Sequence, residues 1–119
     1  MDVHLDRQKE DVLQILVTAR HVDLTDDIRR YIDEKAGRLS RFYDRIHEVE
    51  VILDHQSEQF KAEIIVRADR KHTFVASLTG PDTFMLIDAI TDKLERQLRT
   101  YKEKNRNHKG GALADDATG

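Results

Sequence analysis

Hydrophobic and polar residues alternate along four segments of the chain, and each alternation is typical of a strand with one buried face. The first segment runs from Leu13 to Arg20, and the other three lie at about residues 48–54, 61–68 and 73–78. Short polar breaks at residues 55–59 and 69–71 separate the last three segments, which predicts antiparallel hairpins. Because the second face of each strand is mixed to polar, we expect a sheet that is covered on one side only.

Two other segments repeat their apolar residues at helical spacing. The first begins after Thr25, a favoured N-cap residue, and continues to about Phe42. Gly37 lies inside it and costs roughly 1 kcal/mol relative to Ala, which argues against a perfectly straight helix but not against a helix. The second helix begins after the Gly80-Pro81-Asp82 break, and its apolar stripe fades near Lys104.

This element order predicts an α+β fold: a β-α-β-β-β-α sandwich with a four-stranded mixed sheet and two roughly parallel helices on one face. A right-handed crossover through the first helix makes the first two strands parallel. We expect residues 12–104 to form the domain, residues 1–11 to form a flexible acidic extension, and residues 105–119 to form a disordered tail.

Composition narrows the class of protein. The chain has 119 residues, of which 39% are hydrophobic and 36% charged, as in a single globular domain with a highly charged surface. The absence of Cys excludes a disulfide scaffold, a thiolate zinc site and a Cys nucleophile. The first residues do not resemble a signal peptide and no segment is long and apolar enough to span a membrane, so we expect a cytoplasmic protein without membrane contact.

Signals of catalysis or metal binding are absent from the sequence. The six His residues show neither HxxxH nor HxH spacing, and no carboxylate lies within an apolar run that would shift its pKa. There is no GxSxG motif, no Gly-rich phosphate loop and no dinucleotide fingerprint. We therefore expect no metal, no cofactor, no small-molecule substrate and no enzymatic activity.

The net charge of −3 conceals two basic blocks. Residues 29–45 contain six Arg or Lys against three acids, and residues 93–109 contain seven against two. On parallel helices packed side by side, these blocks predict a groove that could hold phosphates, because Arg offers a bidentate fork. Structured RNA is contacted largely through its backbone in this way. The expected RNA-binding residues are Lys35, Arg38, Arg41, Lys93, Arg96 and Arg99.

A solvated charged surface explains the same residues without a ligand, and composition alone slightly favours it. Three of the basic residues have an acid four positions earlier, in the pairs Glu34–Arg38, Asp92–Arg96 and Glu95–Arg99. Such pairs stabilise a helix by a few tenths of a kcal/mol. Tyr31 and Tyr101 could stack on bases near the groove, but packing at the edge of the core is the commoner role.

Two stretches of the chain resemble a known family. Residues 20–35 (RHVDLTDDIRRYIDEK) with residues 38–42 (RLSRF) resemble the first strand-to-helix segment of the ribosome hibernation-promoting factors. This family is also called ribosome-associated inhibitor or protein Y, and its members were once labelled sigma-54 modulation proteins. Residues 82–90 (DTFMLIDAI) with residues 92–98 (DKLERQL) resemble its second-helix signature. The resemblance covers about residues 13–104.

The resemblance implies a fold and a function. Family members have the sandwich fold described above and bind the small ribosomal subunit between head and body, over the sites of messenger and transfer RNA. There they block initiation during stress or stationary phase. The family's rRNA-contacting positions correspond to Lys35, Arg38, Arg41, Lys93 and Arg96, whereas a further basic position is Thr100 here, flanked by Arg99 and Lys102.

The resemblance therefore implies a short ribosome hibernation factor that is monomeric off the ribosome, with the small subunit and its rRNA as partners. Two other functions stay open. The same groove would suit an RNA-binding protein that acts off the ribosome, and the older family label would suit a protein-interaction regulator of a sigma factor. The role of both termini and any promotion of ribosome dimers are not implied.

Overall fold

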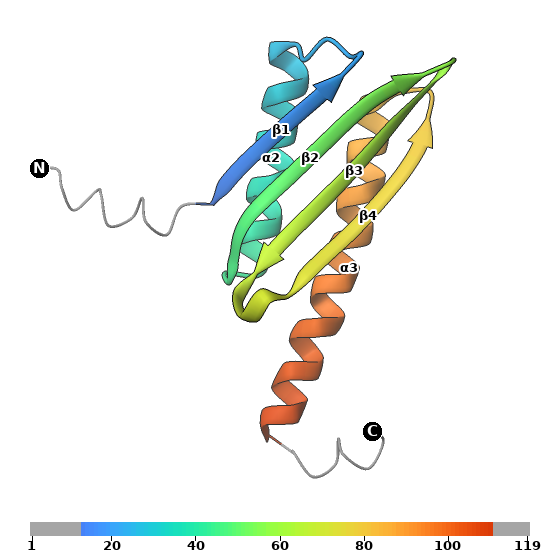
Figure 1. Ribbon diagram of the computed structural model, residues 1–119. Coiled ribbons are helices and arrows are strands. Elements are labelled where there is room, and N and C mark those ends of the chain that lie inside the picture. Colours follow the sequence, from blue (N-terminus) through green and yellow to red (C-terminus); the bar gives the residue numbers. More distant parts are fainter. Residues whose placement is uncertain (1–12, 111–119) are drawn as a thin grey trace, which may run out of the picture.

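The computed structural model describes residues 13–110, and the side chains within residues 13–69 and 71–104 (Figure 1). Its elements follow the predicted order. They are β1 (Gln14–Arg20), α2 (Asp26–Phe42), β2 (Ile46–Gln56), β3 (Gln59–Ala68), the short 3₁₀ helix η1 (Asp69–Lys71), β4 (Thr73–Gly80) and α3 (Thr83–Gly110).

The four strands form one mixed sheet in the order β1-β2-β3-β4. β1 and β2 pair in parallel and are connected by the crossover helix α2, whereas the pairs β2–β3 and β3–β4 are antiparallel. The register aligns the apolar positions of one face across the sheet, since Val51 is paired with Val17 on one side and with Ile64 on the other. The predicted α+β fold with a mixed sheet is confirmed.

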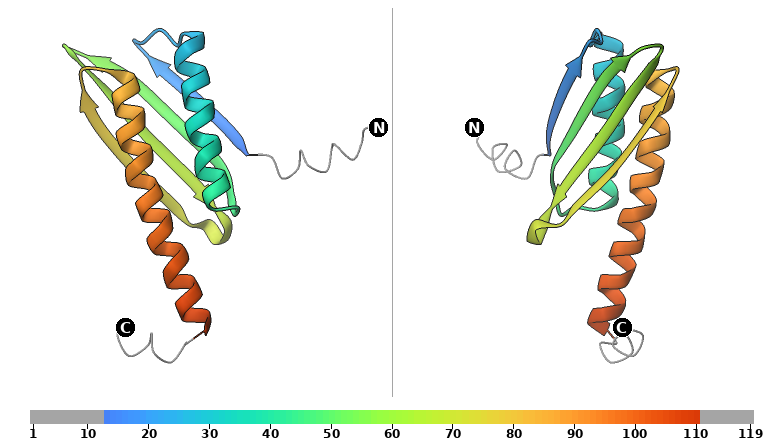
Figure 2. Two further views of the ribbon diagram at one scale, coloured as in Figure 1. Left: turned by 180° about the vertical axis from the view of Figure 1, so that it is seen from behind. Right: turned by 45° about the vertical axis from the view of Figure 1, so that its right-hand side comes forward.

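Both helices cover the same face of the sheet, and Figure 2 shows them side by side with their N-terminal ends at the same end of the molecule. The core lies between these two layers. Leu53, Ile90, Leu94 and Leu98 are completely buried in it. The opposite face of the sheet is open, and there Leu16 and Val75 remain 40% and 45% exposed.

The first helix begins where its capping residue predicts. The Thr25 hydroxyl accepts a hydrogen bond from the Ile28 backbone N–H at 3.2 Å, which satisfies one of the free donors at the helix start. Asp26 and Asp27 add negative charge to the first turn, where the helix dipole favours it. At Gly37 a Cβ atom would lie 4.0 Å from the Arg41 guanidinium, an ordinary van der Waals distance, so packing does not require glycine there.

The second helix is longer than predicted. It begins at Thr83, where the side chain of the preceding residue, Asp82, accepts a hydrogen bond from the Phe84 backbone N–H at 3.2 Å. It continues to Gly110, past the expected end at residue 104. Residues 105–110 are polar apart from Gly110, so hydrophobic periodicity could not predict that they are helical. Extending an existing helix by one residue costs little free energy, because each added residue gains a hydrogen bond. The extension expected at residues 1–11 and the tail from 111 onward lie outside the described residues. Neither described helix has an apolar stretch suited to crossing a bilayer.

Candidate RNA-binding surface

The predicted basic residues lie in the second half of α2 and in the middle of α3. In α2 the first turn is acidic, and the three predicted basic residues follow in the second half of the helix. The predicted basic residues of α3 begin at Lys93, after ten residues (83–92) that contain no base. Because the helices run parallel and side by side (Figure 2), these two segments lie in the same outer layer.

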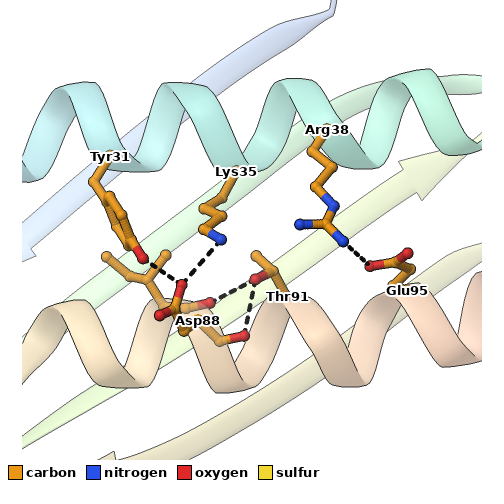
Figure 3. A network of polar contacts seen from close by, with 7 residues as sticks. Tyr31, Lys35, Arg38, Asp88, Thr91 and Glu95 are labelled. Carbon is orange, nitrogen blue, oxygen red and sulfur yellow. Dashed lines mark hydrogen bonds and ion pairs between the residues drawn. The ribbon is translucent and has the colours of Figure 1, made fainter.

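At the N-terminal side of this region, Asp88 of α3 joins two side chains of α2 (Figure 3). One carboxylate oxygen accepts a hydrogen bond from the Tyr31 hydroxyl and lies 3.1 Å from the Lys35 Nζ. The hydrogen bond from Tyr31 and the charge of Lys35 lower the pKa of Asp88. The same contacts raise the pKa of Tyr31 and of Lys35. Lys35 is therefore a fixed, charged side chain that is only 20% exposed.

Further along the groove, Glu95 of α3 lies between two arginines from different helices. Its Oε1 is 3.4 Å from the Arg38 Nη2 (Figure 3), and its Oε2 is 3.7 Å from the Arg99 Nη2. The glutamate side chain is 19% exposed, whereas the arginines are 55% and 52% exposed. The carboxylate is thus better shielded from water than either guanidinium group that it contacts.

The C-terminal end of the groove is covered by Phe42. The guanidinium of Arg99 and the ammonium of Lys102 each lie 5.3 Å from the centre of its ring, within the range of a cation–π contact. Lys102 also donates a hydrogen bond to the Phe42 backbone carbonyl at 3.2 Å, so a cation from α3 caps the end of α2. Arg99 therefore has Phe42 of α2 as a neighbour in addition to Glu95.

The structure brings three of the six predicted residues into the groove, namely Lys35, Arg38 and Arg99. Arg41 and Arg96 lie on the outer surfaces of their helices, are exposed, and form no ion pair among the described residues. Lys93 lies about one turn before Gln97, whose side-chain amide donates a hydrogen bond to the Val75 carbonyl of β4. Lys93 is exposed and forms no ion pair among the described residues, so the contacts between the helices involve Lys35, Arg38 and Arg99, with Arg41, Lys93 and Arg96 exposed around them. RNA binding by these six residues stays a prediction.

The predicted pairs within each helix were only partly right. Glu95–Arg99 forms, but Arg38 pairs with Glu95 across the groove instead of with Glu34. Asp92 and Arg96 do not pair within the part of the chain that the structure describes. Glu95 is a better partner for Arg38 than Glu34 because Glu95 is less exposed, and an ion pair is stronger where water screens it less.

Both tyrosines pack at the edge of the core, as expected. Tyr31 contacts the edge of Phe84 with a ring distance of 5.2 Å, and Tyr101 contacts Tyr43 and Phe74 in the same manner. Sequence reasoning missed the acids Asp88 and Glu95 as groove residues. Their only signal was their position on the flank of the apolar stripe of α3, which does not say whether that flank meets α2 or solvent.

The remaining described contacts join two or three titratable groups each: Arg67 lies against Glu48 and Glu50, and Asp69 against Arg45 and His47. His21 hydrogen-bonds Asp54 at 3.1 Å, a contact that lowers the pKa of that carboxyl. His47 pairs with Asp69 at the turn that precedes β4. Within residues 13–110 there is no group of three His, Asp or Glu placed to hold a metal ion.

Fold and charge together place the chain in the class of small, one-sided α+β sandwiches with a basic helix layer. The family model described as Sigma 54 modulation protein / S30EA ribosomal protein matches residues 15–106. The chain belongs to this family.

Relatives and solved structures agree with this assignment. The chain is 34% identical over 102 residues to a Ribosome hibernation promoting factor of Pseudomonas putida, with 86% of this chain and 99% of the relative covered. The Escherichia coli K12 protein of that name is 32% identical over 98 residues, covering 81% of this chain and all of the relative.

Among solved structures, the Thermus thermophilus Protein Y N-terminal domain has 28% identity and a TM-score of 0.65, covering 75% of this chain and 97% of that domain. A ribosomal subunit interface protein from Coxiella burnetii has a TM-score of 0.70 and 24% identity, covering 76% of this chain and 98% of that one. At that identity it supports the fold alone.

Proposed function

We propose that this chain is a cytoplasmic ribosome hibernation factor that binds the small subunit in the decoding channel and blocks messenger and transfer RNA sterically. The observation that carries the proposal is that Lys35 and Arg38 of α2 and Arg99 of α3 are linked through acids of α3 in the helix layer of a protein of this family. Long-range attraction and direct contact with the phosphate backbone both follow from such a layer.

Two kinds of cation serve different purposes in this mechanism. Lys35, Arg38 and Arg99 are held in place by carboxylates, so they lose little side-chain freedom when a phosphate binds. Arg41 and Arg96 are exposed at the rim and supply attraction and further phosphate contacts. Contacts to about six phosphates give a slope of log affinity against log salt of roughly −4 to −5.

The test is sedimentation of purified protein with vacant ribosomes on sucrose gradients at low and moderate salt, with and without messenger and initiator transfer RNA. We expect the protein to migrate with small subunits and to be displaced by these ligands. Migration without displacement would place the binding site outside the decoding channel. Protein that stays at the top of every gradient would refute ribosome binding.

Two double variants, each of which removes two positive charges, test whether this surface binds the RNA. Arg41→Gln combined with Arg96→Gln removes two rim cations that are not needed for any described ion pair. We expect subunit binding to weaken at least about tenfold and the salt slope to fall by about two. Arg20→Gln with Lys61→Gln makes the same charge change on the open sheet face and serves as the control. Equal loss in both double variants would show that only net charge matters.

A further inference from the structure

The groove between the helices contains a carboxylate where a phosphate-binding surface would be expected to exclude one. The Glu95 side chain is 19% exposed and lies between Arg38 and Arg99, at 3.4 and 3.7 Å from their guanidinium groups. A phosphate that approaches this part of the groove therefore meets two positive charges and one fixed negative charge. The glutamate lowers the affinity of the groove for polyanions in general.

The same carboxylate also orients both arginines. A guanidinium has five N–H donors, and the ion pairs to Glu95 are formed by the Nη2 of each arginine. The Arg99 guanidinium also lies 5.3 Å from the centre of the Phe42 ring, so this side chain has two neighbours that favour one orientation. Both arginines are half-exposed, and these contacts bias their remaining N–H donors toward one arrangement.

These two effects have different consequences for different RNA molecules. An RNA surface whose phosphates match the free donors gains two oriented arginines while its phosphates stay clear of the carboxylate. An RNA with another phosphate spacing must either approach Glu95 or pull the arginines away from it, and both cost free energy. Specificity often arises in this way, from a repulsive element placed against the wrong partner.

We propose that Glu95 is a specificity-determining residue, which holds Arg38 and Arg99 for the phosphate arrangement of one rRNA site and penalises other RNA backbones. This inference rests on the proposed function, because it assumes a structured RNA site on the small subunit. It assigns the groove and the rim different tasks: the rim supplies affinity for any RNA, and the groove selects.

The test compares Glu95→Gln with the unmodified chain in binding to vacant small subunits and to a short RNA duplex of unrelated sequence. Gln keeps the shape and an acceptor oxygen but removes the charge. We expect affinity for the duplex to rise about three- to tenfold, with a salt slope steeper by about one, because repulsion by one nearby charge is removed. Affinity for subunits should stay constant or fall by up to about twofold, because the matching phosphates already avoid the carboxylate and only the orientation of the arginines is lost.

Asp92→Asn is the matched control, since it removes one acid from the exposed surface of the same helix and forms no ion pair among the described residues. It should raise the two affinities by a similar small factor. Arg38→Lys is a second, independent variant: it keeps the charge but loses the oriented fork, so subunit binding should weaken while duplex binding stays constant. Urea unfolding of each variant verifies that the fold is intact.

Each outcome decides the matter. If Glu95→Gln raises both affinities by the same factor, or changes neither, Glu95 does not select between RNAs and the inference is overturned. If the unmodified chain binds the unrelated duplex but no subunits, the proposed function is refuted. The inference about Glu95 is then refuted too, because it assumes an RNA site on the small subunit. A rise for the duplex alone supports the inference.

Discussion

Replacing Asp88 by Asn should destabilise the contact between the two helices, because Asp88 joins α3 to both Tyr31 and Lys35 of α2. Asp88 is 47% exposed and Lys35 is 20% exposed, so the ion pair belongs near the range of surface pairs, at about 0.5 kcal/mol. The Tyr31 hydroxyl donates to a charged acceptor that is partly screened, and Asn retains a weaker acceptor, so this change costs about 0.5 kcal/mol more. The total is about 1 kcal/mol, or about 4 °C in Tm.

The pH dependence of this loss identifies its cause. The pKa of Asp88 is lowered in the folded state, so its contribution is present above about pH 4, the unfolded value, and disappears as the pH falls through the folded value. The pKa of Lys35 is raised, so its contribution is present below about pH 10 and disappears as the pH rises through the folded value. The difference in stability between wild type and Asp88→Asn should therefore form a plateau from about pH 5 to pH 10.

Urea unfolding followed by circular dichroism at several pH values measures this difference directly. Asp92→Asn removes a charge from the same helix without a described partner and controls for the general effect of net charge. Equal stability of Asp88→Asn and wild type at pH 7 would contradict the contact between the helices. A difference that persists undiminished near pH 3 would show that its origin is packing and not the charge of Asp88.

Three further changes test the packing, the first helix cap and the open sheet face. Leu94→Ala in the fully buried core should lower the free energy of unfolding, measured in urea, by about 3 kcal/mol. An unchanged stability would contradict the packing of the helix layer on the sheet. Thr25→Ala should cost about 1 kcal/mol and Thr25→Ser almost nothing, because Ser retains the capping oxygen; equal losses would exclude the cap. Arg67→Gln removes the cation 3.0 Å from Glu50 and should lower the stability slightly at low salt and less at high salt; a salt-independent loss would point to packing.

Local patterns determined the elements and the buried face of each. Alternation with a period of two located the strands, and the Thr25 cap located the start of α2, because both signals depend on residues close together in the chain. The end of α3 was not predictable in this way. Its last residues carry no apolar stripe, and helix propagation needs none.

The sequence by itself also located the two basic blocks and the family resemblance. It did not determine how the charges are arranged between the helices. Only the packed structure shows that Asp88 and Glu95 face α2, that Gln97 reaches β4, and that Arg38 takes its partner from the other helix. The reason is physical: helical periodicity defines the angle of a side chain about its own axis, but which neighbour lies at that angle depends on how two distant helices pack and slide against each other.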